Sequence, residues 1–456
     1  MKSKHHNFHD PRYSMLLSGI NDYVKKEAKG VKGMNAKHEM VTAMSRVIEK
    51  RTAAEGGLIH RISQLLTKLL LFFKKDKKGV LDDCMEILLE YKLLKLAGLD
   101  AKADEKKEEL KFSQCDPKWV EAVLVWIDAY VIHHDKPSYA KYKQLDDFAY
   151  DIPDKDLKVG LIADWGTGEE QAELVLDQLF AQQPDIILHL GDIYYSGTEE
   201  EYQDNYLDVI VKCRKKHGVN TPVYNLPGNH DYYSGGQPFY DFLSKTNSQA
   251  SDYPQQEASY FVLGNSSWQL QGMDTGHNDR NVFEVGKDIT HLQIKEVTWH
   301  HHHLDKGLAS DKRILLFSHH QLFSRFLNIG KISHNKHLLK HFDKYLDKVS
   351  GWFWGHEHLL EIYKPFLGLE KGRCIGNGAV PIIYDEGNPY RATAKYKGSP
   401  ISPIPDIIPE SVVDNNGDIY ANGFVMLDLK VNKEGKVFYY SILPDEELKL
   451  VHQEEL

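Results

Sequence analysis

The sequence predicts an α/β domain that follows an all-helical N-terminal region. Between about residues 13 and 134, Lys, Glu, Ala and Leu dominate, and apolar residues recur at spacings of three and four, as on amphipathic helices. After Pro153, short apolar runs alternate with helical stretches. Strands of this near-continuous apolar character are typical of a sheet that is covered on both faces.

Composition limits the class of protein. The 456 residues suffice for two or three domains, and 41% hydrophobic with 27% charged residues is ordinary globular usage, which excludes a largely disordered or fibrous chain. A net charge of -10 argues against a mainly electrostatic nucleic-acid binder. Four scattered cysteines predict a reducing compartment. Because the N-terminus lacks the apolar stretch of a signal peptide, we expect a soluble, cytoplasmic protein with no membrane span.

The strands and helices of the α/β region follow one another with clear breaks. Strands are expected at 158–164, 184–192, 221–231, 312–320 and 350–358, and helices over 169–182, near 200–216 and near 335–348. A hairpin is expected over 421–443, turning at Lys433-Glu434-Gly435. The four histidines at 300–303 are interpreted as the polar face of a helix end that needs no metal.

These patterns divide the chain into three parts. Residues 1–152 form a helical domain or cap of unknown role, 153–446 the α/β domain, and 447–456 a C-terminal tail.

Each strand run ends in side chains that can bind metal. These are Asp164, Asp192, Asn229 with His230, His319 with His320, and His356 with His358. In open α/β sheets, ligands gather at the carboxyl ends of the strands, so five loops are expected to meet at one rim. Carboxylates mixed with imidazoles suit Zn, Mn, Fe or Ni. The set exceeds what one ion needs, whereas two ions bridged by a carboxylate would use it and could clamp an in-line displacement at phosphorus.

The motifs at these ends resemble a known family, the calcineurin-like metallophosphoesterases, and most closely the purple acid phosphatases. The family pattern is DxG, GDxxY, GNHD/E, VxxH and GHxH. The chain has DWG at 164–166, GDIYY at 191–195, GNHD at 228–231, LFSH at 316–319 and GHEH at 355–358, so that only the Val of the fourth block is replaced, by Leu. The resemblance covers about 155–445 and implies a β-sandwich flanked by helices, which hydrolyses phosphomonoesters by attack of a metal-bound hydroxide.

The resemblance also implies a role for each ligand. It assigns the first metal to Asp164, Tyr195 and His358, the second to Asn229, His319 and His356, and the bridge to Asp192. It further implies Fe(III) in the first position and divalent Fe, Zn or Mn in the second. A tyrosine binds as phenolate only when a strong Lewis acid displaces its proton, which agrees with trivalent iron beside Tyr195.

Other side chains are candidates for contact with the substrate. Asn229 and His230 are expected to face the phosphate, and His230, supported by Asp231 or a neighbour, is a candidate catalytic acid, with His320 as the other. Four aromatics that follow the ligands either wall the cleft or simply pack, and two arginines either clamp phosphate or are solvated: Trp165, Tyr194, Tyr232, Tyr233, Arg280 and Arg325.

Alternative functions remain open at this point. The substrate is a phosphorylated small molecule or a phosphoprotein, and the same metal pair would also serve a phosphodiesterase or a phosphoprotein phosphatase. An interaction protein that acts through the helical region, whose partner is unknown, is a third reading. Many purple acid phosphatases are secreted, and the larger ones place a β-sandwich before the catalytic domain. The helical leader departs from that pattern, so an acidic extracellular site of action is not implied.

Overall fold

The computed structural model describes positions 122, 125 and 126 and residues 128–456, apart from 249, 251–252, 282–289, 327–328, 330–331, 383–394, 397–398, 401, 409–419 and 444–445. The chain divides into two units, Met1–Asp135 and Lys136–Leu456. In the first unit, positions 122, 125 and 126 are helical and a short helical turn is described at η1 (Asp128–Ile132). Residues 1–121 of the predicted helical region lie outside the described residues. Residues 136–152, which the sequence analysis placed with that region, lie in the second unit.

The strands of the second unit form two large sheets within the described residues. The first sheet has the order β1 (Ala149–Asp151), β5 (Phe261–Gly264), β6 (Trp268–Met273), β7 (Arg313–Ser318), β8 (Gly351–Trp354), β10 (Gly372–Ile375), β9 (Leu360–Tyr363), β13 (Ile407–Ile408). The second has the order β16 (Leu448–Glu455), β15 (Gly435–Ile442), β14 (Gly423–Leu429), β2 (Leu157–Ile162), β3 (Ile186–His189), β4 (Val223–Asn225). A small separate pair is formed by β11 (Lys395–Tyr396) and β12 (Ser399–Pro400).

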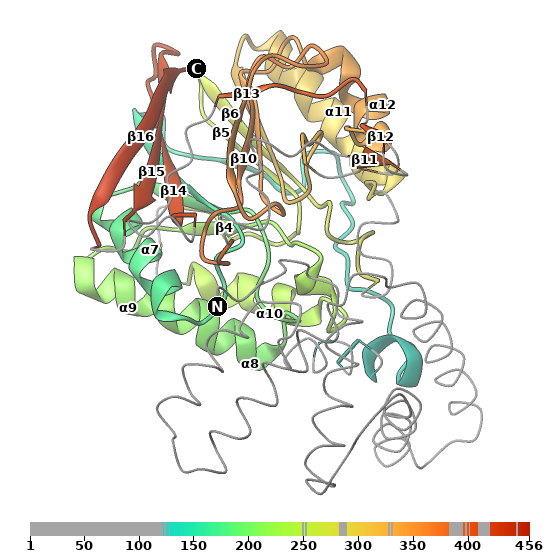
Figure 1. The fold of residues 1–456 in the computed structure, drawn as a ribbon, viewed down its shortest axis with the longest axis vertical. Helices are drawn as coiled ribbons and strands as arrows, with labels where there is room; N and C mark the ends of the chain where they lie inside the picture. Colours follow the sequence, from blue (N-terminus) through green and yellow to red (C-terminus); the bar gives the residue numbers. More distant parts are fainter. Residues whose placement is uncertain are drawn as a thin grey trace, which may run out of the picture. The chain divides into compact units, whose positions relative to one another are not determined.

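Helices cover the outer face of each sheet (Figure 1). The second sheet packs against α7 (Glu170–Ala181), α8 (Glu199–Tyr202), η2 (Gln203–Leu207), α9 (Asp208–His217) and α10 (Gln237–Thr246). The first sheet packs against α11 (Ile294–Ala309), α12 (Lys336–Phe342) and η4 (Asp343–Tyr345). A further short turn, η3 (His230–Tyr232), follows β4. The predicted β-sandwich flanked by helices is therefore confirmed.

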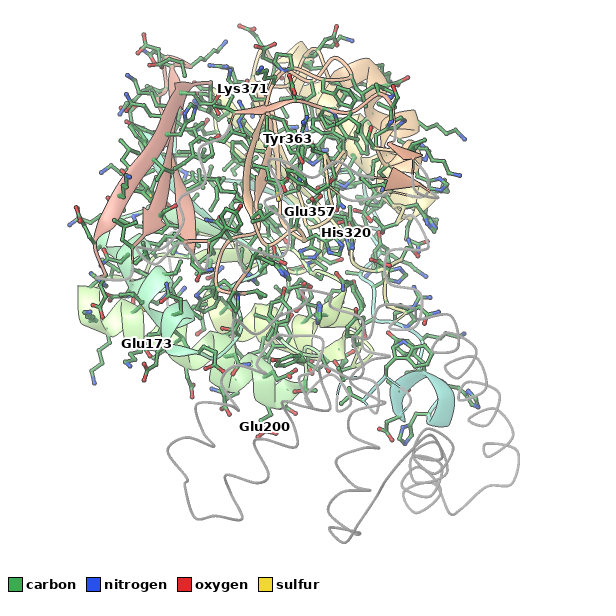
Figure 2. All side chains as sticks on the ribbon, in the orientation of Figure 1. Glu173, Glu200, His320, Glu357, Tyr363 and Lys371 are labelled. Carbon is green, nitrogen blue, oxygen red and sulfur yellow. The ribbon has the colours of Figure 1, made fainter. Side chains whose placement is uncertain are left out.

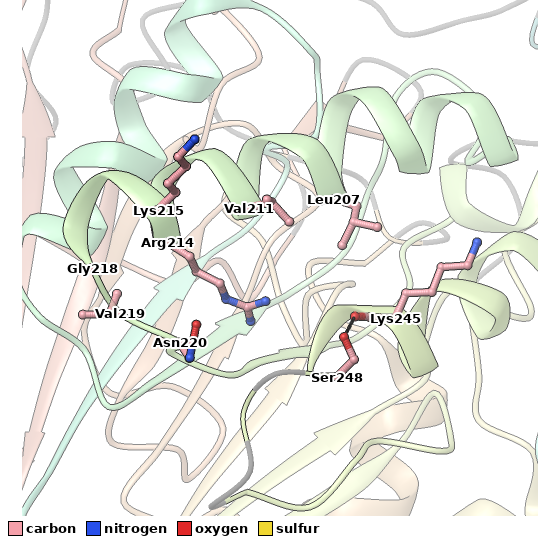
Figure 3. Close-up of a pocket in the computed structure, with 9 residues that line it drawn as sticks. All are labelled: Leu207, Val211, Arg214, Lys215, Gly218, Val219, Asn220, Lys245 and Ser248. Atoms are coloured by element: carbon pink, nitrogen blue, oxygen red, sulfur yellow. Dashed lines mark hydrogen bonds between the residues drawn. The ribbon is translucent and has the colours of Figure 1, made fainter.

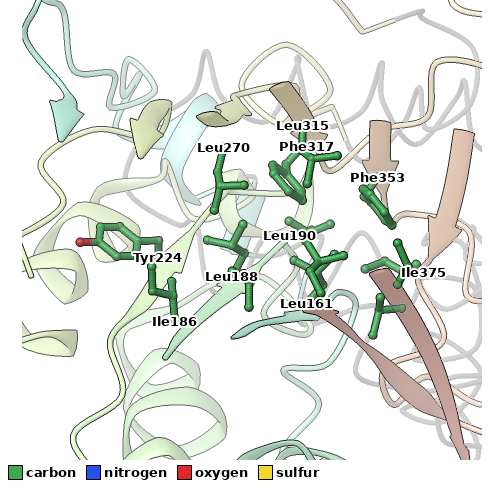
Figure 4. Packing of buried hydrophobic residues seen from close by; sticks show 14 of the residues in the cluster. Leu161, Ile186, Leu188, Leu190, Tyr224, Leu270, Leu315, Phe317, Phe353 and Ile375 are labelled. Carbon is green, nitrogen blue, oxygen red and sulfur yellow. The ribbon is translucent and has the colours of Figure 1, made fainter. Parts of the chain in front are cut away.

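The inner faces of the two sheets share one hydrophobic core (Figure 4). Leu161 and Leu188 from the second sheet, with Phe317 and Phe353 from the first, are buried in it. Ile187, between two inward residues of β3, packs on the opposite face under the helices. Successive strand residues point to opposite faces, so a strand buried on both sides must be apolar at every position. This is why the sequence shows continuous apolar runs.

Parallel pairing brings the carboxyl ends of the central strands to the same end of the sandwich. The strands β2, β3 and β4 are parallel neighbours, as are β6, β7, β8 and β10. All five strands expected to precede metal-binding side chains are present. The expected hairpin is present as β14 and β15, with Lys433 in its turn at φ 71°.

The predicted C-terminal tail contains an ordered strand. Residues of β16 pair with β15 along their length. The guanidinium of Arg373 on β10 donates to both carboxylate oxygens of Glu454 on β16, at 2.7 and 2.6 Å. This bidentate pair ties the last strand of one sheet to the other sheet.

The interpretation of the histidine run as a polar helix end was wrong. The run lies in the middle of α11, and His300 and His303 are buried. His300 lies 2.7 Å from Nε2 of Gln271, and Nε2 of His303 donates to the carbonyl of Leu145 at 2.7 Å. His300 and His303 are buried and His301 and His302 are half-exposed, as expected for residues three apart on one face of a helix. Four identical residues in a row do not show in the sequence which of them face the core.

Among the described residues, none of the helices combines the length and the apolar character that crossing a membrane requires.

We predict that Leu188→Ala destabilises the unit by about 2–5 kcal/mol, because the fully buried side chain fills the core between both sheets and its loss leaves a cavity. Urea unfolding measures the change. Val211→Ala on the exposed side of α9 is the control, since the Val211 side chain is 51% exposed and its loss should change stability by less than about 0.5 kcal/mol. Equal effects of the two variants would contradict the assignment of Leu188 to the core.

Candidate metal centre

The five strand ends deliver the predicted ligands to one place. Each side chain lies one to four residues beyond its strand: Asp164 after β2, Asp192 after β3, Asn229 after β4, His319 after β7, and His356 and His358 after β8. Candidate ligand atoms of Asp164, Asp192 and His319 all lie within 4.8 Å of one another. In Figure 2, the labels of His320 and Glu357 mark this end of the strands. The predicted convergence of five loops is thus present.

Three of these residues have an unusual backbone. Asp164, Asp192 and His356 have φ of 53°, 73° and 70°, in the left-handed region that residues with a Cβ seldom adopt. Such conformations persist where the surroundings fix them, and they gather at functional sites. Here the amide of His356 donates to Oδ2 of Asp164 at 2.8 Å, which locks two of the loops together across the sandwich.

One group of atoms corresponds to the first predicted metal position. Oδ1 of Asp164 lies 3.4 Å from Nε2 of His358. The hydroxyl of Tyr194 lies 2.9 Å from the same nitrogen, 3.1 Å from Oδ1 of Asp164 and 3.2 Å from Oδ2 of Asp192. All four side chains are nearly or completely buried.

A second group corresponds to the other position. Nε2 of His319 lies 3.4 Å from Oδ2 of Asp192, 3.3 Å from Oδ1 of Asn229 and 3.3 Å from Nδ1 of His356. Oδ1 of Asn229 lies 3.1 Å from the same His356 nitrogen. Oδ2 of Asp192 belongs to both groups, which places this carboxylate where a bridge between two ions is expected.

The hydrogen bonds around the second group turn several acceptor atoms toward one another. Nδ1 of His319 donates to the carbonyl of Leu190 at 2.9 Å, so Nε2 of the neutral ring carries a lone pair. Nδ2 of Asn229 donates to the hydroxyl of Tyr233 at 2.8 Å, which turns Oδ1 toward that lone pair. With Oδ2 of Asp192, three buried acceptors then face one another, and either a bound cation or a proton on His319 is needed to balance them.

The spacing of the cluster fits metal ions. Ligands about 2.1 Å from a metal lie roughly 3.0–3.4 Å from one another in octahedral or tetrahedral coordination. The distances in the second group, 3.1–3.4 Å, fall in this range, and so does the 3.4 Å between Asp164 and His358 in the first group. The residues present therefore fit two divalent or trivalent cations.

Charge at the cluster leads to the same conclusion. Burial raises the pKa of Asp192, but the imidazoles of His319 and His230 outweigh it and bring the pKa well below its usual value. Burial lowers the pKa of His319, while Asp192 and Asp164 raise it, to about 9. A cluster without metal would thus hold a proton on His319, which is the cation that the carboxylates require.

The structure differs from the sequence analysis at the tyrosine. The hydroxyl that lies among the ligands is that of Tyr194, which the sequence analysis took for a packing or cleft-wall residue. Tyr195, the position that the family pattern selects, contributes its backbone: its carbonyl accepts from Nδ1 of His230 at 2.7 Å and its amide donates to Glu201. The motif spacing selects Tyr195, whereas the backbone of the structure turns the hydroxyl of Tyr194 toward the candidate ligands. The ligand role of Tyr195 stays a prediction, and Tyr194 is a second candidate.

His230 lies beside the bridging carboxylate. Because its Nδ1 donates to the carbonyl of Tyr195, its Nε2 faces the cluster, 3.8 Å from Oδ2 of Asp192. Burial lowers the pKa of the imidazole. The orientation suits a group that contacts a substrate held at the cluster.

The carboxylate of Asp231 binds groups of the surrounding loops and not the imidazole of His230. Oδ2 accepts from the amides of Gly228 and Asp192 at 2.6 and 2.9 Å, and Oδ1 accepts from the hydroxyl of Tyr202 at 2.5 Å. Burial and the neighbouring Asp192 raise the pKa of Asp231 to about 7. These contacts make it a positioning residue, in place of the acid support that the sequence analysis expected.

His320 is held at both ring nitrogens. Nε2 lies 2.9 Å from Oδ2 of Asp279, and Nδ1 lies 3.1 Å from the hydroxyl of Thr275. Its ring centroid is 4.3 Å from that of His356. The ring therefore packs on a ligand, and its own nitrogens are engaged elsewhere, which favours a supporting role over that of a proton donor.

The two arginines considered as phosphate clamps contact other groups. Arg325 donates to the carbonyl of Pro405 at 2.9 Å and to the carboxylate of Asp406 at 3.1 Å. Arg280 donates to the carbonyl of His277. These contacts fit structural roles.

Two glycines of the motifs leave room for the carboxylates. A Cβ at Gly228 would overlap Oδ1 of Asp192, and a Cβ at Gly355 would overlap Oδ2 of Asp164. The glycines of GNHD and GHEH are thus required because the ligands approach the backbone closely.

A cavity of about 270 Å³ lies elsewhere, beside the last turn of α9 (Figure 3). It is lined by apolar Val211 and by Arg214, Lys215 and Lys245. Arg214 is buried and donates to backbone carbonyls, including that of Thr246 at the end of α10. Cations at helix ends satisfy carbonyls and complement the helix dipole, which accounts for Arg214 without a ligand.

Comparison with known proteins finds a family model that matches part of this domain. Residues 157–360 match the family model described as Calcineurin-like phosphoesterase. This segment contains the candidate ligands from Asp164 to His358. The resemblance to this family that the motifs showed is thus confirmed over the matched segment.

Two curated relatives match parts of the chain. A probable cyclic nucleotide phosphodiesterase of Colwellia psychrerythraea is 28% identical over 133 residues, which are 28% of this chain and 44% of that protein. A probable glycerophosphodiester phosphodiesterase GpdQ of Arcobacter nitrofigilis is 28% identical over 141 residues, 30% of this chain and 42% of that protein. The chain thus spans less than half the length of these relatives.

Solved structures with a similar fold include two phosphatases. A dimetal phosphatase from Danio rerio aligns with a TM-score of 0.43 and 13% identity, over 65% of this chain and 99% of that one. The purple acid phosphatase PPD1 from yellow lupin aligns with a TM-score of 0.40 and 14% identity, over 65% of this chain and 53% of that one.

We predict that Gly228→Ala greatly weakens metal binding while the fold persists, because the added methyl group displaces the Asp192 carboxylate that both positions share. Metal analysis after dialysis measures occupancy, and circular dichroism reports the fold. The matched control is Gly264→Ala on β5, where the nearest atom, Nζ of Lys312, is flexible and 3.4 Å away. Full metal occupancy in Gly228→Ala would contradict the role of Asp192 as a shared ligand.

Proposed function

We propose that this protein is a dinuclear-metal phosphatase that hydrolyses phosphomonoesters and resembles the purple acid phosphatases. The observation that supports this most strongly is the meeting of buried acceptors from Asp192, Asn229 and His319 at distances that suit a bound metal ion. The calcineurin-like phosphoesterase family supplies the reaction class, hydrolysis of phosphoric esters.

Seven side chains would hold the metal pair in this proposal. Asp164, His358 and one of Tyr194 and Tyr195 would bind one ion, Asn229, His319 and His356 the other, and Asp192 both. When bound, such a pair supplies Lewis-acid stabilisation of charge on phosphate oxygens and activation of water for in-line attack. Fe(III) with divalent Fe, Zn or Mn is the proposed composition, because a phenolate ligand favours a trivalent ion.

His230 is the proposed proton donor. Its Nδ1 is held by the carbonyl of Tyr195, and its Nε2 faces the cluster. A group in this position can donate to a phosphate oxygen or to the leaving oxygen. Asp231 holds the loop that carries His230 and Asn229, and His320 supports the ring of His356. Asn229 and His230 together would orient the phosphate.

Phosphodiester hydrolysis is the second candidate. It is favoured by the two curated relatives, whose names are those of phosphodiesterases. A phosphoprotein phosphatase would use the same metal site, and the walls around it decide between the three. Binding of a partner by the N-terminal region is a separate function that is compatible with any of these three activities.

The substrate class is tested by comparing turnover of p-nitrophenyl phosphate, bis-p-nitrophenyl phosphate and a phosphopeptide by the full chain loaded with iron and zinc. We expect the monoester to have the highest kcat/KM, because a dianion gains more than a monoanion from two adjacent cations. Asp192→Ala, which removes the shared ligand, is expected to abolish turnover of all three. A higher kcat/KM for the diester would replace the first proposal by the second, and no turnover at full metal occupancy would refute both.

The tyrosine ligand is tested by colour. A phenolate bound to Fe(III) absorbs visible light, so we expect the iron-loaded protein to be coloured and one Tyr→Phe variant to be bleached. The contacts of the Tyr194 hydroxyl lead us to expect bleaching in Tyr194→Phe, whereas the family pattern expects it in Tyr195→Phe. Each variant is the control for the other. A colourless, active protein with two divalent ions would contradict a phenolate ligand altogether.

A further inference from the structure

A segment before β1 is fixed along the surface of the domain. We call residues 136–148 the strap. The amide of Ser138 donates to the carbonyl of Gly235 at 3.0 Å, and the amide of Ala140 donates to the hydroxyl of Tyr240 on α10 at 3.0 Å. Further along the strap, Nε1 of Trp299 on α11 donates to the carbonyl of Asp147 at 2.9 Å. The strap therefore joins α10 to α11.

One side chain of the strap reaches a buried carboxylate. The hydroxyl of Tyr139 donates to Oε2 of Glu296 on α11 at 2.7 Å. Glu296 is completely buried, and its Oε1 accepts from the amide of Asp274 at 2.9 Å and lies 3.1 Å from Nε2 of His300. The Tyr139 ring also packs on His277, at 4.9 Å between centroids. Glu296 is thus the link between the strap and the loop after β6.

The loop after β6 contacts the two segments that carry His230 and His320. Oδ2 of Asp274 accepts from the hydroxyl of Tyr232 at 2.6 Å, and Tyr232 closes the turn η3, which begins at His230. The next residue, Thr275, accepts from the amide of His320 at 2.9 Å through its hydroxyl. Asp274 and Thr275 therefore anchor both His230 and His320 from one place.

We propose that Tyr139 is a positioning residue for the hydrolytic reaction, acting through Glu296, Asp274 and Tyr232 on the turn that carries His230. Glu296, Asp274 and Tyr232 are buried, and Tyr139 is half-buried. Because a buried polar group without its partner is strongly disfavoured, the buried links favour a single arrangement. Without the Tyr139 hydroxyl, Oε2 of Glu296 loses its donor from the strap, and only the contacts of Oε1 with the amide of Asp274 and with His300 hold the carboxylate. Asp274 and the turn beyond it are then anchored less firmly.

The test compares Tyr139→Phe with Tyr150→Phe in the full chain. Tyr150 on β1 is the matched control, because its hydroxyl accepts one hydrogen bond, from the amide of Glu257 at 3.0 Å, and it is no part of the chain to His230. At equal metal occupancy we expect Tyr139→Phe to lower kcat by about 3- to 10-fold, the effect of one hydrogen bond, with KM changed less than about twofold. Tyr150→Phe should leave kcat near that of the parent.

A second readout does not need turnover. Hydrogen exchange of the amides in 228–235 is expected to be faster in Tyr139→Phe than in the parent, and unchanged in Tyr150→Phe. Equal kcat and equal exchange in the two variants would overturn the positioning role. This inference rests on the proposed phosphoesterase activity. If the fully metal-loaded parent hydrolyses no phosphoester, the proposed function fails, and unchanged exchange in Tyr139→Phe would independently overturn the inference.

Discussion

The geometry of the candidate site depends on three buried hydrogen-bond acceptors that face one another. The lone pair of His319, the amide oxygen of Asn229 and the carboxylate of Asp192 repel one another, and they are removed from water. Such an arrangement is unfavourable unless a proton on His319 or a bound cation balances it. The large core between the sheets offsets this local cost, and the acceptors lie where the proposed metal pair would bind.

Fixing the acceptors takes more side chains than the ligands alone. Asp231 gathers the amides of two loops, Tyr233 orients the amide of Asn229, and the carbonyl of Leu190 sets the tautomer of His319. These contacts define which atom of each ligand faces the cluster. Since a metal site depends on such supports for its geometry, they matter to its chemistry as much as the ligands do.

Much of the site could be predicted from sequence because strand ends and motif spacing carry that information. Continuous apolar runs located β2, β3, β7 and β8, and the structure brings together the candidate ligands that follow them. Choices between neighbours could not be made this way. Tyr194 and Tyr195 have the same chemistry, and only the backbone path decides which hydroxyl turns inward. The burial of His300 and the pairing of β16 depend on distant partners, which local patterns do not encode.

The hydrogen bond between the amide of His356 and the carboxylate of Asp164 joins positions 192 residues apart. Contacts of such long range form late, because closing a large loop is entropically unfavourable until the intervening chain has collapsed. During biosynthesis, Asp164 is therefore synthesised before His356, and neither residue has its final geometry until both are present. Metal ions would then bind only after the chain has folded. Because they bind the native state and not the unfolded chain, they would stabilise the native state by mass action.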